Sequence, residues 1–237
     1  TPSNPLLKVS DIKAIVEIAK GHNIKTVADN TFMTALYQKP LDLGCDIVIE
    51  SLTKFVNGHS DVTAGCAVTN NEEIAAEICL LQKNFGGILG VEDAWLILRG
   101  MKTMGLRMEK SVENAKILTK FLESQDKIKK VYYPNLTSCK FYGIHAEQAS
   151  SGGAVFSFEF FEQADLKTFL KKIKIPIYAI SLGGVESIIS HPATMSHACM
   201  SEEERLAQGV TQTLLRFSCG VEDAEDLIED LTQALTD

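Results

Sequence analysis

Apolar positions early in the chain follow first a helical and then a strand-like pattern. Residues 10–20 carry four apolar side chains at helical spacing, Ile12, Ile15, Val16 and Ala19. Ser10 could cap the start of this helix and Gly21 its end. The segment therefore predicts an amphipathic helix that buries one face.

Short apolar runs then alternate with helical patterns. Strands are expected at 24–30, 45–51 and 62–69, and helices at 72–83 and from about residue 91 onward. Strands that alternate with helices are typical of α/β proteins. The pattern predicts a parallel, doubly wound sheet.

The long, mostly helical segment 94–121 is interrupted only by Gly100 and Gly105. We interpret it as the connection between two domains, with a boundary near residue 112. The expected domains are residues 1–112 and 113–237.

The second half of the chain has a different pattern. Strands are expected at 129–134, 152–160, 175–181 and 214–220, and helices at 164–173, 201–208 and 222–235. Phe156, Phe158 and Phe160 alternate, as in a sheet with one buried face. These elements predict a smaller α+β domain.

Composition narrows the possible functions. The chain has 237 residues, of which 45% are hydrophobic, and a net charge of −8, which argues against nucleic-acid binding. No apolar run approaches the roughly 20 residues of a membrane helix, and the start of the chain lacks a signal-peptide pattern. The six cysteines are expected to be mostly buried free thiols, and no ligand spacing suggests zinc. A cytoplasmic protein is expected.

The stretch ESLTKFVNGHSDVTAG, residues 50–65, contains the first candidate for chemistry. Lys54 follows one expected strand, as Asp29 ends another, and ligands of such sheets bind at the carboxyl ends of the strands. A desolvated lysine can form a Schiff base with an aldehyde cofactor. Pyridoxal phosphate needs such a lysine, a carboxylate for its pyridine nitrogen and donors for its phosphate, here Ser51 and Thr53.

Each of these residues also has an ordinary explanation. A lysine is most often a solvated charge, and Asp29 before Asn30 could be a turn residue or a helix cap. Serine and threonine are common beside strand ends. Taken together at two strand ends, the residues favour a cofactor site.

Longer motifs carry a resemblance to a known family. The chain contains TPSNPLL, VADNTF, DIVIESLTKFVNGHSDVTAG, LRGMKTMGLRME and SLGGVESIISHPATMSH, in this order. Together they resemble the pyridoxal-phosphate enzymes of Cys/Met metabolism, which include cystathionine β-lyase, cystathionine γ-lyase, cystathionine γ-synthase and methionine γ-lyase. The resemblance covers essentially the whole chain and implies the fold type I (aspartate aminotransferase-like) α/β architecture.

The resemblance implies a role for each cofactor residue. Lys54 would be the Schiff-base lysine, and Asp29 would pair with the protonated pyridine nitrogen. Ser51 and Thr53 would hold the phosphate, and Asn4 would lie near the cofactor hydroxyl and the substrate carboxylate.

Three further residues are placed by the same motifs. Arg216 would bind the substrate α-carboxylate, a planar bidentate contact that suits a guanidinium, and Ser181 would contribute nearby. Without the resemblance, Arg216 would pass as a surface residue at a strand end. His59 is expected to have a structural role.

The resemblance also implies partners. Family members carry a further N-terminal segment before TPSNP, which supplies a tyrosine that stacks on the cofactor and donors to its phosphate. The chain is therefore expected to be the C-terminal portion of an enzyme that needs this segment for tight cofactor binding. A homo-oligomer is implied, as a tetramer built from two dimers.

The reaction within the family is less sharply indicated. Ile180 precedes Ser181, where γ-synthases and γ-lyases commonly carry glutamate. An apolar residue there fits some β-lyases and the methionine γ-lyases, and the stretches NTFMT and FGGILG resemble bacterial-type β-lyases. We therefore expect a carbon–sulfur lyase of the cystathionine β-lyase type acting on sulfur amino acids. Methionine γ-lyase and cystathionine γ-lyase or γ-synthase remain alternatives, as does a non-catalytic partner chain.

Overall fold

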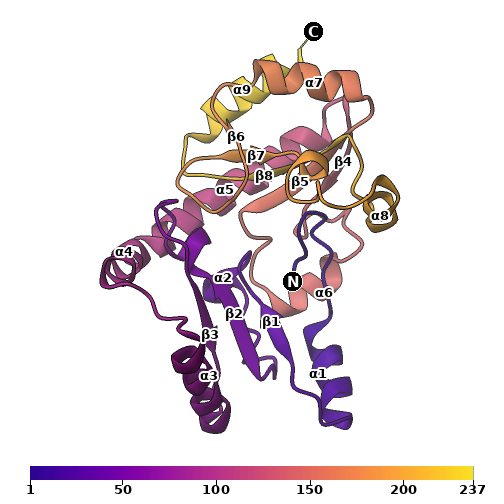
Figure 1. Ribbon diagram of the computed structural model, residues 1–237. Coiled ribbons are helices and arrows are strands. Elements are labelled where there is room, and N and C mark those ends of the chain that lie inside the picture. The colour runs from indigo at the N-terminus through magenta and orange to yellow at the C-terminus, as the bar shows by residue number, and fades with distance from the viewer. Residues whose placement is uncertain (237) are drawn as a thin grey trace.

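The computed structural model describes residues 1–236 and contains two β-sheets from separate halves of the chain (Figure 1). The first has the order β1 (Val27–Asp29), β2 (Ile47–Ser51) and β3 (Gly65–Val68). β1 and β2 are parallel, as expected, but β3 runs antiparallel to β2. The α/β class is confirmed, whereas a purely parallel sheet is wrong for this part. The connection from β2 to β3, residues 52–64, contains only the short turn η1 (Leu52–Val56) and no crossover helix.

Helices flank this sheet. They are α1 (Ile12–Gly21), α2 (Thr34–Tyr37), α3 (Glu72–Phe85) and α4 (Val91–Met101). The caps predicted for α1 are wrong by one residue at each end. Asp11 caps the start because its carboxylate accepts a hydrogen bond from the backbone N–H of Ala14, and the C-cap is His22. The short α2 was not expected from the sequence.

The second sheet has five strands in the order β4-β5-β8-β7-β6. The bounds are β4 (Ile128–Tyr132), β5 (Val155–Phe160), β6 (Ile177–Tyr178), β7 (Ile188–Ser190) and β8 (Leu214–Ser218). All pairs are antiparallel except β6 with β7. The strand expected at 175–181 is only two residues long, and β7 was missed because three residues are too few to show alternation.

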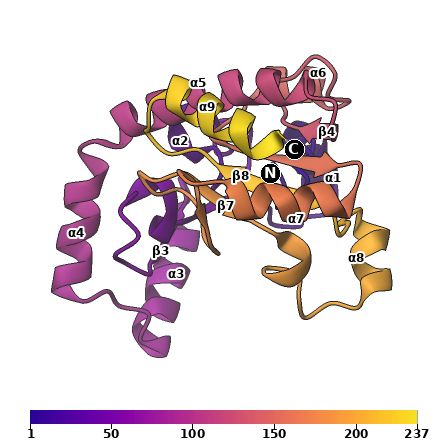
Figure 2. The same cartoon turned by 90° about the horizontal axis from the view of Figure 1, so that it is seen from above.

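Helices α5 (Met104–Glu123), α7 (Gln163–Lys172) and α9 (Ala224–Leu235) pack over this sheet. Two further helices lie to its side (Figure 1). They are α6 (Tyr142–Gln148), which was not expected and bonds to the start of α1, and α8 (Glu202–Gln208), which buries none of its residues. α7 and α9 lie over the strands β7 and β8 in both views (Figures 1 and 2). Residue 112 lies inside α5, so the expected boundary between domains falls within a continuous helix and stays a prediction.

The aromatic core lies under these helices. Phe156 of β5 stacks on Phe217 of β8 with ring centroids 5.0 Å apart, and Phe158 meets Phe169 of α7 edge to face. Every residue of β5 is buried, including Ser157, whose hydroxyl donates to the carbonyl of Pro5. The expectation of one buried face is therefore wrong, because the segment near the start of the chain covers the other face.

Two further expectations concern the burial of the cysteines and the absence of a membrane helix. All six cysteines are free, but Cys79 and Cys199 are exposed and only Cys219 is fully buried, so the expectation of mostly buried thiols is wrong. Within residues 1–236, we find no helix with both the length and the apolar character needed to span a bilayer.

Candidate active site

One wide helical turn positions the candidate lysine. Directly after β2 the chain forms a π-helical turn, η1 (Leu52–Val56), and Lys54 departs from helical geometry within it, with φ −98° and ψ −136°. Single π-helical turns are rare and are found frequently at functional sites. Lys54 therefore lies beyond the carboxyl end of a strand on backbone that neither a strand nor an α-helix would supply.

A hydrogen bond joins Lys54 to the second half of the chain. Its Nζ donates to Oγ of Ser181 over 2.7 Å, across 127 positions of sequence. Ser181 has a φ of +84°, which is uncommon for a residue with a side chain. A Cβ at Gly183, whose φ is +82°, would lie 2.7 Å from the backbone nitrogen of Phe55. Glycine therefore permits the loop 181–183 to pack directly on η1.

Arg216 is the most deeply buried cation of this group. It lies on the central strand β8 and is 4% exposed. Its Nη1 donates to Oδ1 of Asn4 at 3.0 Å, and its Nη2 donates to Oγ of Ser190 at 3.0 Å and to the carbonyl oxygen of Ser181 at 2.5 Å. Arg216 is thus in direct contact with Asn4 and Ser181, the two residues expected to lie near it.

The charge of Arg216 is not balanced nearby. No carboxylate among residues 1–236 forms an ion pair with it, and its buried Nε has no hydrogen-bond partner. Burial lowers the pKa of Arg216 to about 10, so the side chain is still a cation at neutral pH. A buried cation with a free donor is suited to binding an anionic group.

This cation acts on Lys54. Burial lowers the pKa of Lys54 below its ordinary value, and the positive charge of Arg216 lowers it further. Both causes disfavour the ammonium form. A larger share of Lys54 is therefore a neutral amine near pH 7 than for a solvated lysine, and only the neutral form is nucleophilic or basic.

Asp29 and Ser51 lie at the ends of the adjacent parallel strands β1 and β2. Thr31 links them, because its backbone N–H donates to Oδ1 of Asp29 and its Oγ1 accepts from the backbone N–H of Ser51, both at 2.9 Å. The two predicted cofactor contacts therefore share one edge of the sheet.

Thr53 is engaged elsewhere. Its hydroxyl donates to the carbonyl oxygen of Ala64 at 3.1 Å and accepts from the backbone N–H of Ala64 at 2.9 Å. This pair of bonds fixes the start of η1 against the segment that leads into β3. Near the other end of η1, Nδ1 of His59 lies 2.6 Å from the carbonyl oxygen of Asn57, in keeping with a structural role.

Arg107 of α5 was given no role from the sequence, although it lies in the motif LRGMKTMGLRME. It is 8% exposed and donates to the carbonyl oxygens of Phe55, Val56 and Gly100 at 2.8, 3.1 and 2.9 Å. A Cβ at Gly58 would lie 1.9 Å from its Nη1. Arg107 thus holds the end of η1 that follows Lys54. No sequence motif indicates this role, because the hydrogen-bond partners of Arg107 are backbone carbonyls.

We expect Arg107→Lys to destabilise the protein. An ammonium cannot reach three carbonyls as the guanidinium fork does, and buried carbonyls that lose a charged donor cost about 1–3 kcal/mol each. The fall in thermal midpoint is measured by circular dichroism. Arg99→Lys is the matched control, since Arg99 is exposed and only overlies Trp95. Equal midpoints for the two variants would show that Arg107 is not holding the turn.

We expect Arg216→Met to raise the pKa of Lys54, because it removes a nearby positive charge that penalises the ammonium form. The measurement is the pH dependence of Lys54 acylation by acetic anhydride, followed by peptide mapping. Arg216→Lys keeps the charge and should leave the pKa lowered. A Lys54 pKa that is unchanged in Arg216→Met would refute the electrostatic coupling, provided that circular dichroism shows a folded protein.

Comparison with known proteins places this geometry in a family. The sequence model of the PLP-dependent enzymes of Cys/Met metabolism matches residues 1–236. Cystathionine beta-lyase MetC of Bacillus subtilis (strain 168) is 49% identical over 235 residues, which are 99% of this chain and 60% of the relative. A cystathionine gamma-lyase of the same organism is 44% identical over 235 residues, 99% of this chain and 62% of the relative.

A solved structure agrees with these sequences. Cystathionine gamma synthase from Xanthomonas oryzae pv. oryzae, in complex with aminoacrylate and cysteine, superposes with a TM-score of 0.97 at 41% identity, covering 99% of this chain and 61% of the other. The chain thus spans about three fifths of the length of these relatives. The family resemblance and the fold type are confirmed: the chain belongs to the pyridoxal-phosphate-dependent enzymes of cysteine and methionine metabolism.

Proposed function

We propose that the protein containing this chain is a pyridoxal-phosphate-dependent carbon–sulfur lyase of sulfur amino acids, specifically a cystathionine β-lyase that yields homocysteine, pyruvate and ammonia. The observation that carries the proposal is the contact of Lys54 with Ser181 beside the unbalanced charge of Arg216. It brings an amine of lowered pKa close to a buried cation that has no ion-pair partner among residues 1–236.

The residues present fit the cofactor. Lys54 is an amine of lowered pKa, Asp29 offers a carboxylate at the neighbouring strand end, and Ser51 has a hydroxyl with no hydrogen-bond partner among residues 1–236. When bound, pyridoxal phosphate supplies an electron sink for negative charge that develops at the substrate Cα. Lys54 would hold the cofactor covalently, Asp29 would face its pyridine nitrogen, and Ser51 would bind its phosphate.

Thr53 fits the phosphate role on one condition. Its hydroxyl proton points to the carbonyl oxygen of Ala64, so Thr53 would have to break this bond to donate to a phosphate. Ser51 carries no such commitment. We therefore assign Ser51 the larger share of the phosphate contact from this stretch.

Arg216 would bind the substrate α-carboxylate. Its side chain already donates to Asn4 and Ser190, which fixes the plane of the guanidinium. The free Nε–H remains for a carboxylate oxygen. Asn4 and Ser181 would thus support substrate binding mainly by orienting Arg216, and Asn4 is exposed enough to contact ligand itself.

Lys54 would move the proton of Cα. Its hydrogen bond to Ser181 directs the amine, and its lowered pKa raises the share of Lys54 that carries a free lone pair. Because Ser181 contacts both Lys54 and Arg216, the base and the carboxylate site are held at a fixed separation. Such fixed geometry is a main source of enzymatic rate enhancement.

The choice of β-elimination rests on Ile180. Its side chain is 69% exposed beside Ser181 and carries no acceptor for a distal substrate ammonium. γ-Elimination requires cystathionine to bind with its homocysteine half in the place of the α-amino acid. In that orientation, position 180 would offer no acceptor to the distal ammonium. Relatives named cystathionine gamma-lyase and cystathionine gamma-synthase match at 44% identity, so γ-elimination or γ-replacement is the second candidate. Methionine γ-elimination and a non-catalytic partner chain remain the alternatives.

Exposed apolar side chains support the proposed protein partners. They concentrate in the first half of the chain, where Val27 and Ile49 lie on one face of the first sheet, and Phe85, Val91 and Trp95 lie on or beside α3 and α4. Phe85 and Val91 are 85% and 89% exposed. Surfaces of this kind mark interfaces. We propose that a preceding segment of the same protein and further copies of it cover them. A tetramer and a cytoplasmic location stay predictions.

Borohydride reduction tests the cofactor site. In the protein at its natural length, loaded with pyridoxal phosphate, reduction should fix the cofactor on Lys54, as peptide mapping by mass spectrometry would show. Lys54→Ala should lose the label, and Lys102→Ala, which changes an exposed lysine, should keep it. Stoichiometric label on another lysine of the unmodified protein would refute the assignment.

Product analysis tests the reaction. The complete enzyme is incubated with cystathionine, and the keto acid is identified by chromatography. Pyruvate is expected, because Ile180 has no acceptor for the distal ammonium of cystathionine in the orientation that leads to γ-elimination. Ile180→Glu should raise the share of 2-oxobutyrate, whereas Ile180→Leu should not. Predominant 2-oxobutyrate from the unmodified enzyme would overturn β-elimination and leave the assignment of Lys54 intact.

A further inference from the structure

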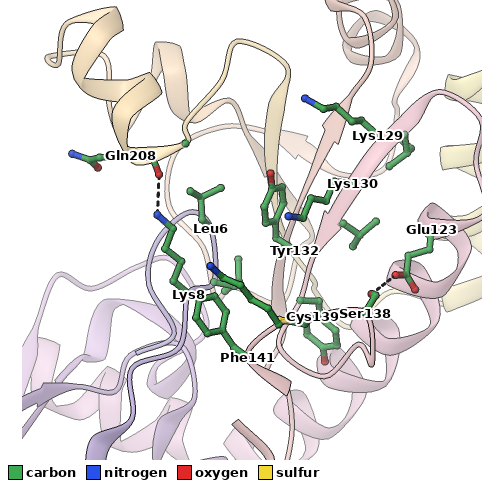
Figure 3. Close-up of a pocket in the computed structure, with 16 residues that line it drawn as sticks. Leu6, Lys8, Glu123, Lys129, Lys130, Tyr132, Ser138, Cys139, Phe141 and Gln208 are labelled. Carbon is green, nitrogen blue, oxygen red and sulfur yellow. Dashed lines mark hydrogen bonds between the residues drawn. The ribbon is translucent and has the colours of Figure 1, made fainter. Parts of the chain in front are cut away.

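A cavity of about 490 Å³ lies apart from the residues assigned to cofactor and substrate (Figure 3). Its walls are the segment 6–8, β4 with Tyr133, the segment 138–141, Glu123 of α5, and the end of α8 with Gly209. Pockets for small organic ligands have volumes of about 300–1,000 Å³. The cavity is therefore large enough for a metabolite of nucleotide size.

Its charged residues are nearly all cationic. Lys8, Lys129, Lys130 and Lys140 line it, against Glu123 as the only acidic residue of the lining. The chain as a whole has a net charge of −8. A cluster of cations is therefore a local feature of this cavity and does not reflect a generally basic surface.

Most of these cations have no carboxylate to neutralise them. Lys129 is the exception, because its Nζ lies 3.2 Å from Oε1 of the buried Glu159. Lys8 donates to the carbonyl oxygen of Gln208 at 3.0 Å. Lys130 and Lys140 overlie the rings of Tyr132 and Phe141, each at 4.8 Å. Among residues 1–236, none of these three has a carboxylate partner.

The single acidic residue does not cancel this charge. Glu123 accepts a hydrogen bond from the Ser138 hydroxyl at 2.7 Å and forms no ion pair with a lysine of the lining. The Tyr132 hydroxyl donates to Glu159, and burial with this carboxylate raises the pKa of Tyr132 to about 12, so the ring stays neutral. The cavity keeps an excess of positive charge.

The floor of the cavity is apolar and partly aromatic. Leu6, Ile128 and Tyr133 are buried there, and Tyr132 and Phe141 add half-buried rings, each with a lysine ammonium over one face. Leu6 and Tyr132 lie between Lys8 and Lys130 in Figure 3. A ligand that is anionic at one end and flat and apolar at the other would match both parts of this lining.

We propose that this cavity is a second ligand site that binds a phosphate-bearing aromatic metabolite of the nucleoside phosphate class. Lys8, Lys130 and Lys140 bind the phosphates, and the apolar floor with Tyr132 and Phe141 receives the base. The proposal does not rest on the lyase activity, because no residue of that site lines the cavity.

The test is calorimetric titration of the protein at its natural length, with pyridoxal phosphate already bound so that the cofactor site takes up no phosphate. The probes are ATP, inorganic triphosphate and adenosine. ATP should bind more tightly than either of the others. The triple variant Lys8→Gln, Lys130→Gln, Lys140→Gln should weaken ATP binding about tenfold or more, and the single variant Lys140→Glu should weaken it measurably.

A matched control removes the same charge elsewhere. Lys116→Gln, Lys120→Gln, Lys167→Gln replaces three exposed lysines outside the cavity and should leave ATP affinity within about twofold. An equal loss in the control would reduce the effect to general electrostatics and refute the site. ATP and triphosphate of equal affinity would refute recognition of the aromatic ring, and no ATP binding by the unmodified protein would refute the proposal as a whole.

Discussion

The burial of Arg216 in the middle of β8 is the constraint on which the rest of the site depends. A buried guanidinium without a carboxylate is tolerated only when its nitrogens are hydrogen-bonded. Asn4, Ser181 and Ser190 accept from the two Nη atoms, and only Nε is left without a partner. These partners come from the beginning of the chain, from the loop after β6 and from β7. The hydrogen bonds of one buried charge therefore tie these three segments together.

Lys54 is coupled to the same charge in two ways. Its amine donates to Ser181, whose carbonyl accepts from Arg216, so one residue orients both cations. The field of Arg216 also adds to burial in lowering the pKa of Lys54. Behind the turn, Arg107 holds the carbonyls that follow Lys54, and Gly183 permits the close approach of the loop in front of it. The lysine is thus supported from both sides by residues that carry no reactive group.

The sequence predicted most strands and helices because their apolar patterns are long enough to show a period. It missed β7 and α2, each shorter than one full pattern, and α6, whose buried residues are the polar His145 and Gln148. It also gave the wrong direction to β3, since strand direction depends on the connection and not on periodicity. Lys54, Asp29 and Ser51 were indicated by their places after strands. Arg216 was indicated only by family motifs, because the residue itself looks like an ordinary strand-end arginine. Arg107 could not be predicted at all: its partners are backbone carbonyls, which every residue has.

The contacts that build the site span most of the sequence. Asn4 meets Arg216 across 212 positions, and Lys54 meets Ser181 across 127. Contacts of such separation close large loops and form late and slowly during folding. A partly folded chain would therefore present Lys54 as an ordinary solvated ammonium, without the neighbour that lowers its pKa. The lowered pKa of Lys54 therefore requires that both halves of the chain have reached their native arrangement.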